Sequence, residues 1–351
     1  MNNAVRTRIF DCQSANLKSK IQKPQWMALF AIVLLLMGLV RLADAQQSDK
    51  LVRIGILDSS TASGSAALWD QCRQELKTLG WTEGKNIAFE FRFAEGKNER
   101  LFELATELAN RKVDLIMVSE TTPALAAKRA TSTIPVVFTN VGDPETAGLV
   151  ASLARPGGNV TGLSSLSTQL NTKRLEVLKD AVPKLARVAI LRPADRGAGS
   201  DLQLKELRPA ALALKIKLEE IDTQPGAKGV EIALQTAKQM PVGAIMTTAH
   251  RVFFAERKRI VELASKYHLP AIYFQREFID AGGLMSYGVD YMDLFRKAAH
   301  YVDKILKGAK PADLPVQQAT KFDFIINLKA AKQIGITIPN GLLERANQVI
   351  K

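Results

Sequence analysis

The chain has 351 residues, 47% of them hydrophobic and 24% charged, with a formal net charge of +13. These proportions exclude a disordered or collagen-like chain, and the length suits about two domains. Basic side chains are interleaved with acidic ones and no run of five basic residues occurs, so we expect a solvated basic surface and no nucleic-acid partner.

The N-terminal region is typical of an export signal. Residues 27–40 (MALFAIVLLLMGLV) are apolar without interruption and follow several basic residues. This run suits the hydrophobic region of a secretory signal and is shorter than the ~20 residues that span a membrane. Because the small residues Ala43 and Ala45 follow, we expect residues 1–45 to be a signal peptide cleaved after Ala45, and the protein to be periplasmic. The long stretch before the apolar run leaves two alternatives, a start codon placed too early or a leader that stays attached as an anchor.

No sequence pattern points to catalysis or to metal binding. The two cysteines, Cys12 and Cys72, lie far apart, and Cys12 falls in the expected leader, so we expect no disulfide. The histidines at 250, 268 and 300 are scattered, and the GxSxG, HExxH and P-loop motifs are absent. We therefore expect neither an enzyme nor a protein with a metal ion or cofactor.

From residue 51 onward, short apolar runs alternate with segments of helical periodicity. The first half has expected strands at residues 51–57, 86–93, 113–119 and 134–139, and expected helices at 66–79 and 98–111. A further helix is expected to open at Thr122-Pro123, with Thr122 as its N-cap. After a Pro- and Gly-rich segment at 155–162 come strands at 186–191, 217–221, 243–247 and 271–274 and helices at 173–181, 201–214, 230–238 and 253–267. This order predicts an α/β protein of two doubly wound parallel-sheet lobes with right-handed crossovers.

Six segments resemble the bacterial ABC-transporter substrate-binding family that includes the tryptophan- and tyrosine-type binding proteins. They are residues 134–138 (IPVVF), 141–144 (VGDP), 156–162 (PGGNVTG), 282–288 (GGLMSYG), 305–315 (ILKGAKPADLP) and 326–335 (INLKAAKQIG). The resemblance extends over nearly all of residues 51–350.

The resemblance implies a type I periplasmic-binding fold, in which two lobes are joined by a three-crossing hinge and the ligand lies in the cleft. Lobe 1 would comprise residues 51–163 plus 287–314, and lobe 2 residues 164–283 plus 315–340. We expect a monomer that captures a small carboxylate-bearing ligand, an amino acid with an aromatic or branched side chain, for an ABC permease in the inner membrane. Another carboxylate or an amide-bearing metabolite is an alternative ligand, and a membrane-anchored ligand sensor is an alternative function.

Ligands of open α/β sheets bind outside the carboxyl ends of the strands, so the loops after the strands are the candidate site. The ligand-binding residues predicted in this way are Asp58, Ser59, Ser60, Ser119, Thr121, Thr122, Asp143, Thr248 and Phe274. Tyr287 and Asp290 are added because they stand where the chain is expected to return to lobe 1. The same rule also points to Arg192, Asp195, His250 and Gln275.

The turn at Thr121-Thr122-Pro123 offers two hydroxyl groups and free backbone N–H groups at a helix start. This arrangement suits the carboxylate of an amino-acid-like ligand, although Thr122 also fits as a simple N-cap. Asp58 and Asp143 suit pairing with a ligand ammonium, and Asp143, which precedes a proline, equally suits a turn.

Two aromatic side chains are candidates for stacking on the ligand. Phe274 and Tyr287 would contact an apolar or aromatic ligand if they face the cleft. Packing in the protein core explains either residue equally well, and the sequence leaves that choice open.

Overall fold

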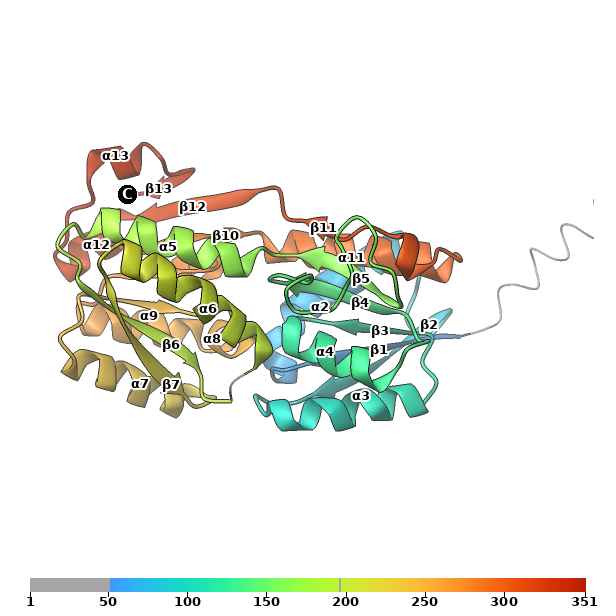
Figure 1. Ribbon diagram of the computed structural model, residues 1–351. Coiled ribbons are helices and arrows are strands. Elements are labelled where there is room, and N and C mark those ends of the chain that lie inside the picture. The colour runs from blue at the N-terminus through green and yellow to red at the C-terminus, as the bar shows by residue number, and fades with distance from the viewer. Residues whose placement is uncertain (1–50, 196) are drawn as a thin grey trace, which may run out of the picture. The chain divides into compact units, whose positions relative to one another are not determined.

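The computed structural model describes residues 51–195 and 197–351, and Leu51–Lys351 forms one compact unit. Two lobes make up this unit, each with helices packed around its own sheet (Figure 1). The expected signal peptide and its cleavage site lie outside the described residues. Within the described part of the chain, no helix is long and apolar enough to span a membrane.

The first lobe contains a six-stranded parallel sheet with the order β11-β5-β4-β3-β1-β2. Its strands are β1 (Val52–Asp58), β2 (Ile87–Phe93), β3 (Leu115–Val118), β4 (Val136–Val141), β5 (Val160–Ser164) and β11 (Gln317–Gln318). Its helical segments are α2 (Ala62–Thr78), η1 (Asn98–Arg100), α3 (Leu101–Asn110), α4 (Thr121–Ala130), α11 (Tyr291–Leu306) and η2 (Pro311–Asp313). Strands β3 and β4 are buried throughout, and apart from Thr139 and Asn140 in β4 their residues are apolar, as expected of a parallel sheet covered on both faces.

The second lobe contains a seven-stranded sheet with the order β13-β12-β10-β9-β8-β6-β7. Its strands are β6 (Arg187–Pro193), β7 (Lys217–Thr223), β8 (Ala244–Thr247), β9 (Ala271–Tyr273), β10 (Met285–Val289), β12 (Phe322–Asn327) and β13 (Gln348–Ile350). Its helices are α5 (Ser167–Ala181), α6 (Ala198–Ala213), α7 (Ala227–Gln239), α8 (Arg251–Ala255), α9 (Arg257–Lys266), α10 (Glu277–Asp280), α12 (Leu328–Ile334) and α13 (Asn340–Leu343). Because β10 and β12 run antiparallel, this sheet is mixed and departs at that pair from the expected parallel arrangement.

The predicted α/β class and the two doubly wound lobes are confirmed, and the predicted strands lie within about two residues of the observed ones. Two predictions about helices are wrong. The helix expected at 253–267 is two helices, α8 and α9, which meet at Glu256. Helix α4 begins at Thr121 with Glu120 at the N-cap position, so Thr122 lies inside the helix and is not its cap.

The chain passes between the lobes three times, after β5, after β10 and after β11. Helix α11 follows the second crossing and packs against α2, β4 and β5 of the first lobe. The crossings differ by a few residues from the expected bounds, because Tyr287 belongs to β10 of the second sheet and Gln317–Gln318 to the first sheet. Strand pairing decides these positions, and the local sequence does not reveal which sheet a short strand joins.

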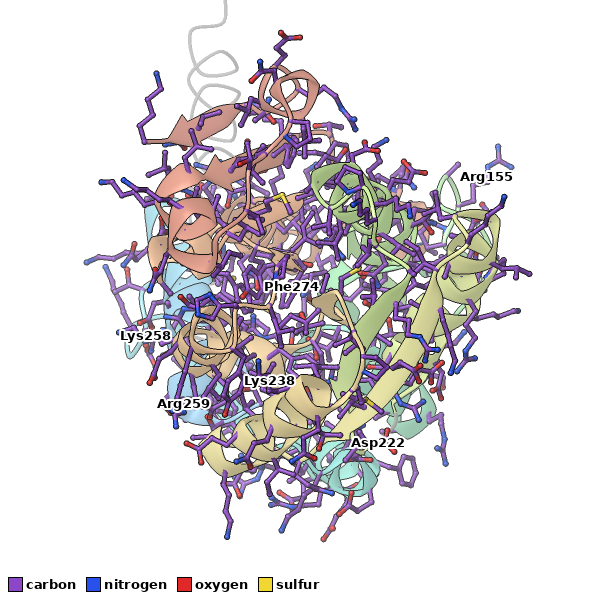
Figure 2. All side chains as sticks on the ribbon, turned by 90° about the vertical axis from the view of Figure 1, so that its left-hand side faces the viewer. Arg155, Asp222, Lys238, Lys258, Arg259 and Phe274 are labelled. Carbon is purple, nitrogen blue, oxygen red and sulfur yellow. The ribbon has the colours of Figure 1, made fainter. Side chains whose placement is uncertain are left out.

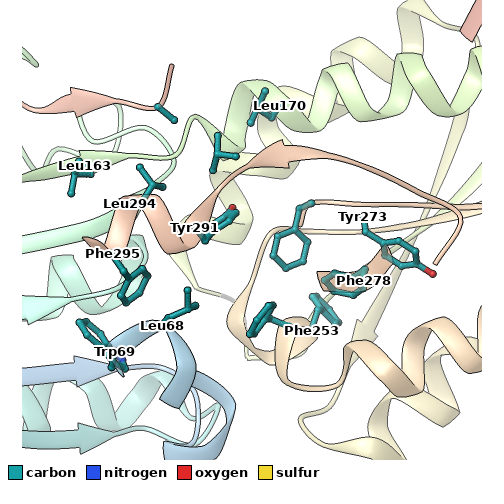
Figure 3. Close-up of a cluster of buried hydrophobic side chains, with 14 of the residues drawn as sticks. Leu68, Trp69, Leu163, Leu170, Phe253, Tyr273, Phe278, Tyr291, Leu294 and Phe295 are labelled. Carbon is teal, nitrogen blue, oxygen red and sulfur yellow. The ribbon is translucent and has the colours of Figure 1, made fainter. Parts of the chain in front are cut away.

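The core of the unit is rich in aromatic contacts. Figure 3 shows Trp69 of α2 beside Phe295 of α11. Their rings meet edge to face with the centroids 4.8 Å apart. In the second lobe Tyr273 stacks on Phe278 with the centroids 4.6 Å apart. Cys72 is buried on the same helix as Trp69, and burial raises the pKa of its thiol to about 12. The thiol therefore stays protonated and unreactive at neutral pH.

Two glycines allow close backbone contacts just before the first and second crossings. Gly162 in β5 has a φ of +150°, and a Cβ there would stand 2.0 Å from the carbonyl oxygen of Phe138 in the neighbouring strand. A Cβ on Gly288 in β10 would stand 2.0 Å from the carbonyl oxygen of Phe274. A larger residue at either position would force paired backbones apart.

We expect Gly162→Ala to lower the free energy of unfolding by about 2–4 kcal/mol, because the added methyl group clashes with β4. Urea denaturation followed by circular dichroism measures this change. Gly158→Ala is the matched control, since a Cβ at Gly158 meets no atom within 4 Å and should cost less than about 1 kcal/mol. Equal stability of the two variants would contradict the close approach of β5 to β4.

Candidate ligand-binding site

A small cavity lies between the two lobes, at the carboxyl ends of strands from both sheets. The first lobe lines it with Glu120, Thr121, Thr122, Asn140, Gly142 and Tyr291, and the second lobe with Ser167, Gly199, Gln203, Ala249, His250, Arg251, Phe274 and Gln275. Its volume is about 20 Å³, which is room for about one water molecule. A larger ligand fits only if the lobes or their side chains move apart.

Five helices begin at this cavity, and one of them is α8, whose first residue is Arg251. Thr121 of α4, Ser167 of α5, Gly199 of α6 and Tyr291 of α11 belong to the first turns of their helices and line it. This convergence follows from the fold, because each helix starts near the end of the strand that precedes it. The unpaired N–H groups and the dipoles of these helix starts favour a negatively charged group in the cavity.

Glu120 carries the only carboxylate among the cavity-lining residues, and its backbone is strained. Its φ of +64° and ψ of 171° fall in a region that residues other than glycine rarely adopt, at a cost of ~1–3 kcal/mol. Its carboxylate accepts hydrogen bonds from the Ser59 hydroxyl at 2.8 Å and from the backbone N–H of Arg251 at 2.7 Å. The Glu120 backbone N–H donates to Oδ1 of Asn140 at 2.8 Å. Strain of this kind is concentrated at functional positions.

The two lobes touch each other around the cavity. The hydrogen bond from Arg251 to Glu120 joins them, and Nδ2 of Asn98 donates to the carbonyl oxygen of Asp195 at 2.8 Å. Near α6 the contact is so close that a Cβ on Gly197 would stand 2.4 Å from Oγ1 of Thr122. The structure is therefore a closed arrangement of the lobes.

Arg251 extends from the second lobe into the first, and its guanidinium group lacks hydrogen bonds. The residue is 2% exposed, and Nε, Nη1 and Nη2 have no hydrogen-bond partner. The nearest carboxylate oxygen is Oδ2 of Asp58, at 4.0 Å from Nη2. The rings of Phe254 and Phe295 each lie 5.6 Å from the guanidinium carbon. These rings supply cation–π attraction but no hydrogen-bond acceptor of conventional strength.

Asp58 is fully buried behind the cavity and organises the first lobe's side of it. Its Oδ2 accepts hydrogen bonds from Nε1 of Trp69 at 2.7 Å and from the Ser119 hydroxyl at 3.2 Å. Its Oδ1 accepts from the backbone N–H of Ser60 at 2.8 Å. A buried carboxylate is stable when donors surround it in this way.

Gln203 is held rigidly by a polar network in the second lobe. Its Oε1 accepts from Nδ2 of Asn171 and from the backbone N–H of Ala249, each at 2.7 Å, and its Nε2 donates to the Ala249 carbonyl at 3.1 Å. Asn171 in turn accepts from Arg174, whose Nε donates to the Tyr287 carbonyl at 2.7 Å. Burial lowers the pKa of Arg174 to about 10, so its guanidinium remains charged at neutral pH.

Aromatic rings form the apolar wall of the cavity. Phe274 and Tyr291 meet edge to face with their centroids 6.1 Å apart, and Figure 2 shows Phe274 toward the middle of the view, with the charged Arg155 and Lys258 at its edges. Burial raises the pKa of Tyr291 to about 12, and Tyr291 shares a hydrogen bond with Ser165. Its phenol is therefore neutral, and the wall can contact an aromatic side chain.

Most of the predicted site residues lie at or just behind the cavity. Thr121, Thr122 and Phe274 line it. Asp58, Ser59 and Ser119 are buried and do not line it. The Ser59 hydroxyl donates to the lining Glu120 carboxylate, and the Ser119 hydroxyl donates to Asp58. Ser60 and Thr248 are buried but do not line it, although the hydroxyl of Thr248 has no hydrogen-bond partner.

Three predicted residues are placed elsewhere. Oδ1 of Asp143 accepts from the backbone N–H of Thr146 at 3.0 Å, so Asp143 forms the alternative turn. Tyr287 lies in β10 and packs against Phe324, with ring centroids 6.0 Å apart. Asp290 is exposed and caps α11.

The residues predicted from the sequence do not include Glu120, Gln203, Arg251 or Tyr291, all of which line the cavity. Glu120 lies between two predicted residues, and Arg251 follows His250, so the strand-end rule pointed to their neighbours. Gln203 and Tyr291 come from helices, for which that rule gives no signal. Among the described residues, no group of three or more His, Cys, Asp or Glu side chains could hold a metal ion.

Two α/β lobes, three crossings and a cavity lined by both lobes define a protein of the type I periplasmic-binding class. Residues 63–350 match the family model described as ABC transporter substrate binding protein. The chain belongs to this family, as its six resembling segments predicted, and is therefore a solute-binding protein and not an enzyme.

Known relatives match most of the chain. A tyrosine-binding protein of Clostridioides difficile (strain R20291) is 27% identical over 265 residues, which are 74% of each chain. A Streptococcus pneumonia ABC domain solved in complex with L-Trp is 25% identical, with a TM-score of 0.74 over 86% of this chain and 100% of that one. A substrate-binding protein with adhesive properties from Clostridium difficile, described as ligand-free and open, is 26% identical with a TM-score of 0.57 over the same shares.

The two TM-scores differ although identity and coverage are nearly equal. This chain is more similar to the structure with bound L-Trp than to the open one. The difference agrees with the interlobe hydrogen bonds at Glu120 and Asn98, which require the lobes to be in contact.

We expect Asp58→Ala to lower the free energy of unfolding by about 3–5 kcal/mol, because it leaves the buried Trp69 indole N–H without its acceptor and the buried Arg251 cation without its nearest carboxylate. Guanidinium chloride denaturation measures the loss. Asp180→Ala is the control, because Asp180 pairs with Arg345 at 2.6 Å where both side chains are 47% exposed. That pair should contribute less than about 1 kcal/mol. A loss at Asp58 no larger than at Asp180 would show that Asp58 does not organise the lobe.

Proposed function

We propose that this protein is the extracytoplasmic solute-binding component of an ABC uptake transporter and that it binds an amino acid with an aromatic or branched side chain. The observation that carries the proposal is the cavity lined by both lobes, in which charged groups lie next to the aromatic wall of Phe274 and Tyr291. Family membership supports a transport role, and the relatives that bind tyrosine or contain L-Trp support an amino acid.

Lobe closure would report that the ligand is bound. The cavity of about 20 Å³ is much smaller than an amino acid, so ligand enters when the lobes are apart and they close around it. A ligand shifts this equilibrium only by its differential affinity for the closed state. Because both lobes line the cavity, a bridging ligand gains contacts on closure. The closed monomer would then dock on a permease of the inner membrane.

Export of the protein is part of the proposal. The leader expected at residues 1–45 supports secretion across the inner membrane, with cleavage after Ala45. The mature protein would begin at residue 46 and would include all of the compact unit from Leu51 to Lys351.

Thermal unfolding in the presence of single ligands tests the amino-acid assignment. We expect the chain from residue 46, refolded to remove ligand acquired during expression, to unfold roughly 4 °C higher with tryptophan, tyrosine or a branched amino acid. That shift corresponds to about 2.7 kcal/mol at a ligand concentration 100 times the Kd. Sugars and polyamines serve as the negative panel.

Two variants test whether the ligand-induced rise in unfolding temperature depends on the cavity. Phe274→Ala should reduce the ligand-induced shift because it removes part of the apolar wall. Phe102→Ala should leave the shift unchanged, since Phe102 is 43% exposed on helix α3. A shift with sugars alone, or no shift with any amino acid, would contradict the assignment.

A further inference from the structure

Arg251 has an unmet requirement for a hydrogen-bond acceptor. It lines the interlobe cavity and is 2% exposed, and among the residues that the structure describes none is a hydrogen-bond partner of its three guanidinium nitrogens. A buried donor without an acceptor is costly, and a buried charged donor more so. In the closed structure the Arg251 guanidinium therefore lacks hydrogen-bond acceptors, and a ligand can supply them.

The protein's own acidic groups do not meet this requirement. Oδ2 of Asp58, at 4.0 Å, is beyond hydrogen-bond distance and already accepts from Trp69 and Ser119. The Glu120 carboxylate bonds the backbone N–H of Arg251 and not its side chain. The Phe254 and Phe295 rings offer only their faces.

The chemistry of the free donors selects a carboxylate. A guanidinium is a planar fork that matches the two oxygens of a carboxylate. Nε2 of Gln275, which is 1% exposed and also lines the cavity, is a second buried donor without a partner. The helix starts around the cavity add a positive potential. A carboxylate would satisfy donors that no group in the described part of the chain satisfies.

The carboxylates at the cavity favour a ligand that carries an amine as well as a carboxylate. Among the described residues of this cluster, Asp58 and Glu120 bring two carboxylates against the one guanidinium of Arg251, which is an excess of acidic side chains. A simple acid would increase that imbalance, whereas a zwitterion leaves it unchanged. Glu120 uses its two oxygens for Ser59 and Arg251, and a carboxylate has about four acceptor sites, so it can also accept a ligand ammonium.

We infer that Arg251, together with Gln275, binds the carboxylate of the ligand, and that Glu120 binds its ammonium group. This inference rests on the proposed function and deepens it, because it identifies the charged head of an α-amino acid as the feature the site recognises. It also moves the carboxylate from the Thr121-Thr122-Pro123 turn, where the sequence suggested it, to a side chain of the second lobe. At that turn Glu120 is the N-cap residue, and its carboxylate bonds Ser59 and the Arg251 backbone without capping the helix.

Arg251 also links recognition to closure. It belongs to α8 of the second lobe, yet its guanidinium lies beside Asp58 and Phe295 of the first lobe. Closing the lobes takes this cation out of water, which is unfavourable unless acceptors replace the lost hydration. A ligand carboxylate supplies them, so the closed state is favoured when a carboxylate-bearing ligand is present.

Matched ligands separate the two charged contacts. Isothermal titration calorimetry would compare L-tyrosine with tyramine, which lacks the carboxylate, and with 3-(4-hydroxyphenyl)propionate, which lacks the amine; L-tryptophan, tryptamine and indole-3-propionate form a second set. We expect the wild-type chain to bind the amino acid at least ~30-fold more tightly than either analogue, as charge-assisted contacts predict.

The variants should lose this discrimination selectively. In Arg251→Met the preference for the amino acid over the amine should fall to within about threefold, while the preference over the acid persists. Glu120→Gln should show the converse pattern. Arg251→Lys keeps a cation beside Asp58 and should lose at least ~10-fold of the preference over the amine, because the bidentate fork is gone. Thermal melting without ligand verifies that each variant is folded, and the lysine variant carries the test if the methionine variant does not fold.

Three results would overturn the inference. An unchanged preference for the amino acid over the amine in Arg251→Met or Arg251→Lys would remove Arg251 from the carboxylate contact. Loss of that preference in Thr121→Ala combined with Thr122→Ala, with Arg251→Lys unaffected, would return the carboxylate to the start of α4. Absence of binding of any amino acid to the wild-type chain would overturn the proposed function itself, which distinguishes that failure from a wrong assignment of Arg251.

Discussion

One guanidinium and two carboxylates are buried together where the two lobes meet. Arg251 comes from the second lobe, and Asp58 and Glu120 come from the first. Buried charges require partners. Asp58 has its donors within the first lobe, Glu120 has one donor in each lobe, and the Arg251 guanidinium has no acceptor among the described residues. The hydrogen bonds that hold Asp58, the strained backbone of Glu120 and the contacts between the lobes all converge on this cluster.

The parallel sheets place this cluster at the cleft. In each lobe the strands end at the same edge, and the helices that follow begin there. The sheets face each other through these edges, so short loops and first turns from both lobes line one cavity. Gly162 and Gly288 allow close backbone contacts in the strands that precede two of the three crossings. The hinge and the site therefore depend on the same strand pairing.

The cavity combines rigid and movable parts. The network of Gln203, Asn171 and the backbone of Ala249 stays within the second lobe and fixes one wall. The hydrogen bond between Glu120 and the Arg251 backbone crosses between lobes and must break when they open. Few contacts join the lobes, so a ligand that bonds to both lobes can decide whether the closed state is favoured. Small changes in the charged groups of the ligand can therefore shift this equilibrium.

The sequence by itself determined the alternation of strands and helices, the two-lobed α/β class and the family, because apolar periodicity and local motifs are properties of neighbouring residues. It also located the strand ends, and with them Thr121, Thr122 and Phe274 at the cavity. Only the tertiary structure decided which lobe each short strand joins and which strand-end residues face the cleft. Arg251 is significant because its guanidinium group is buried without hydrogen-bond acceptors and lies near carboxylates from distant parts of the sequence. Those are properties of the packed lobes, and no local pattern encodes them.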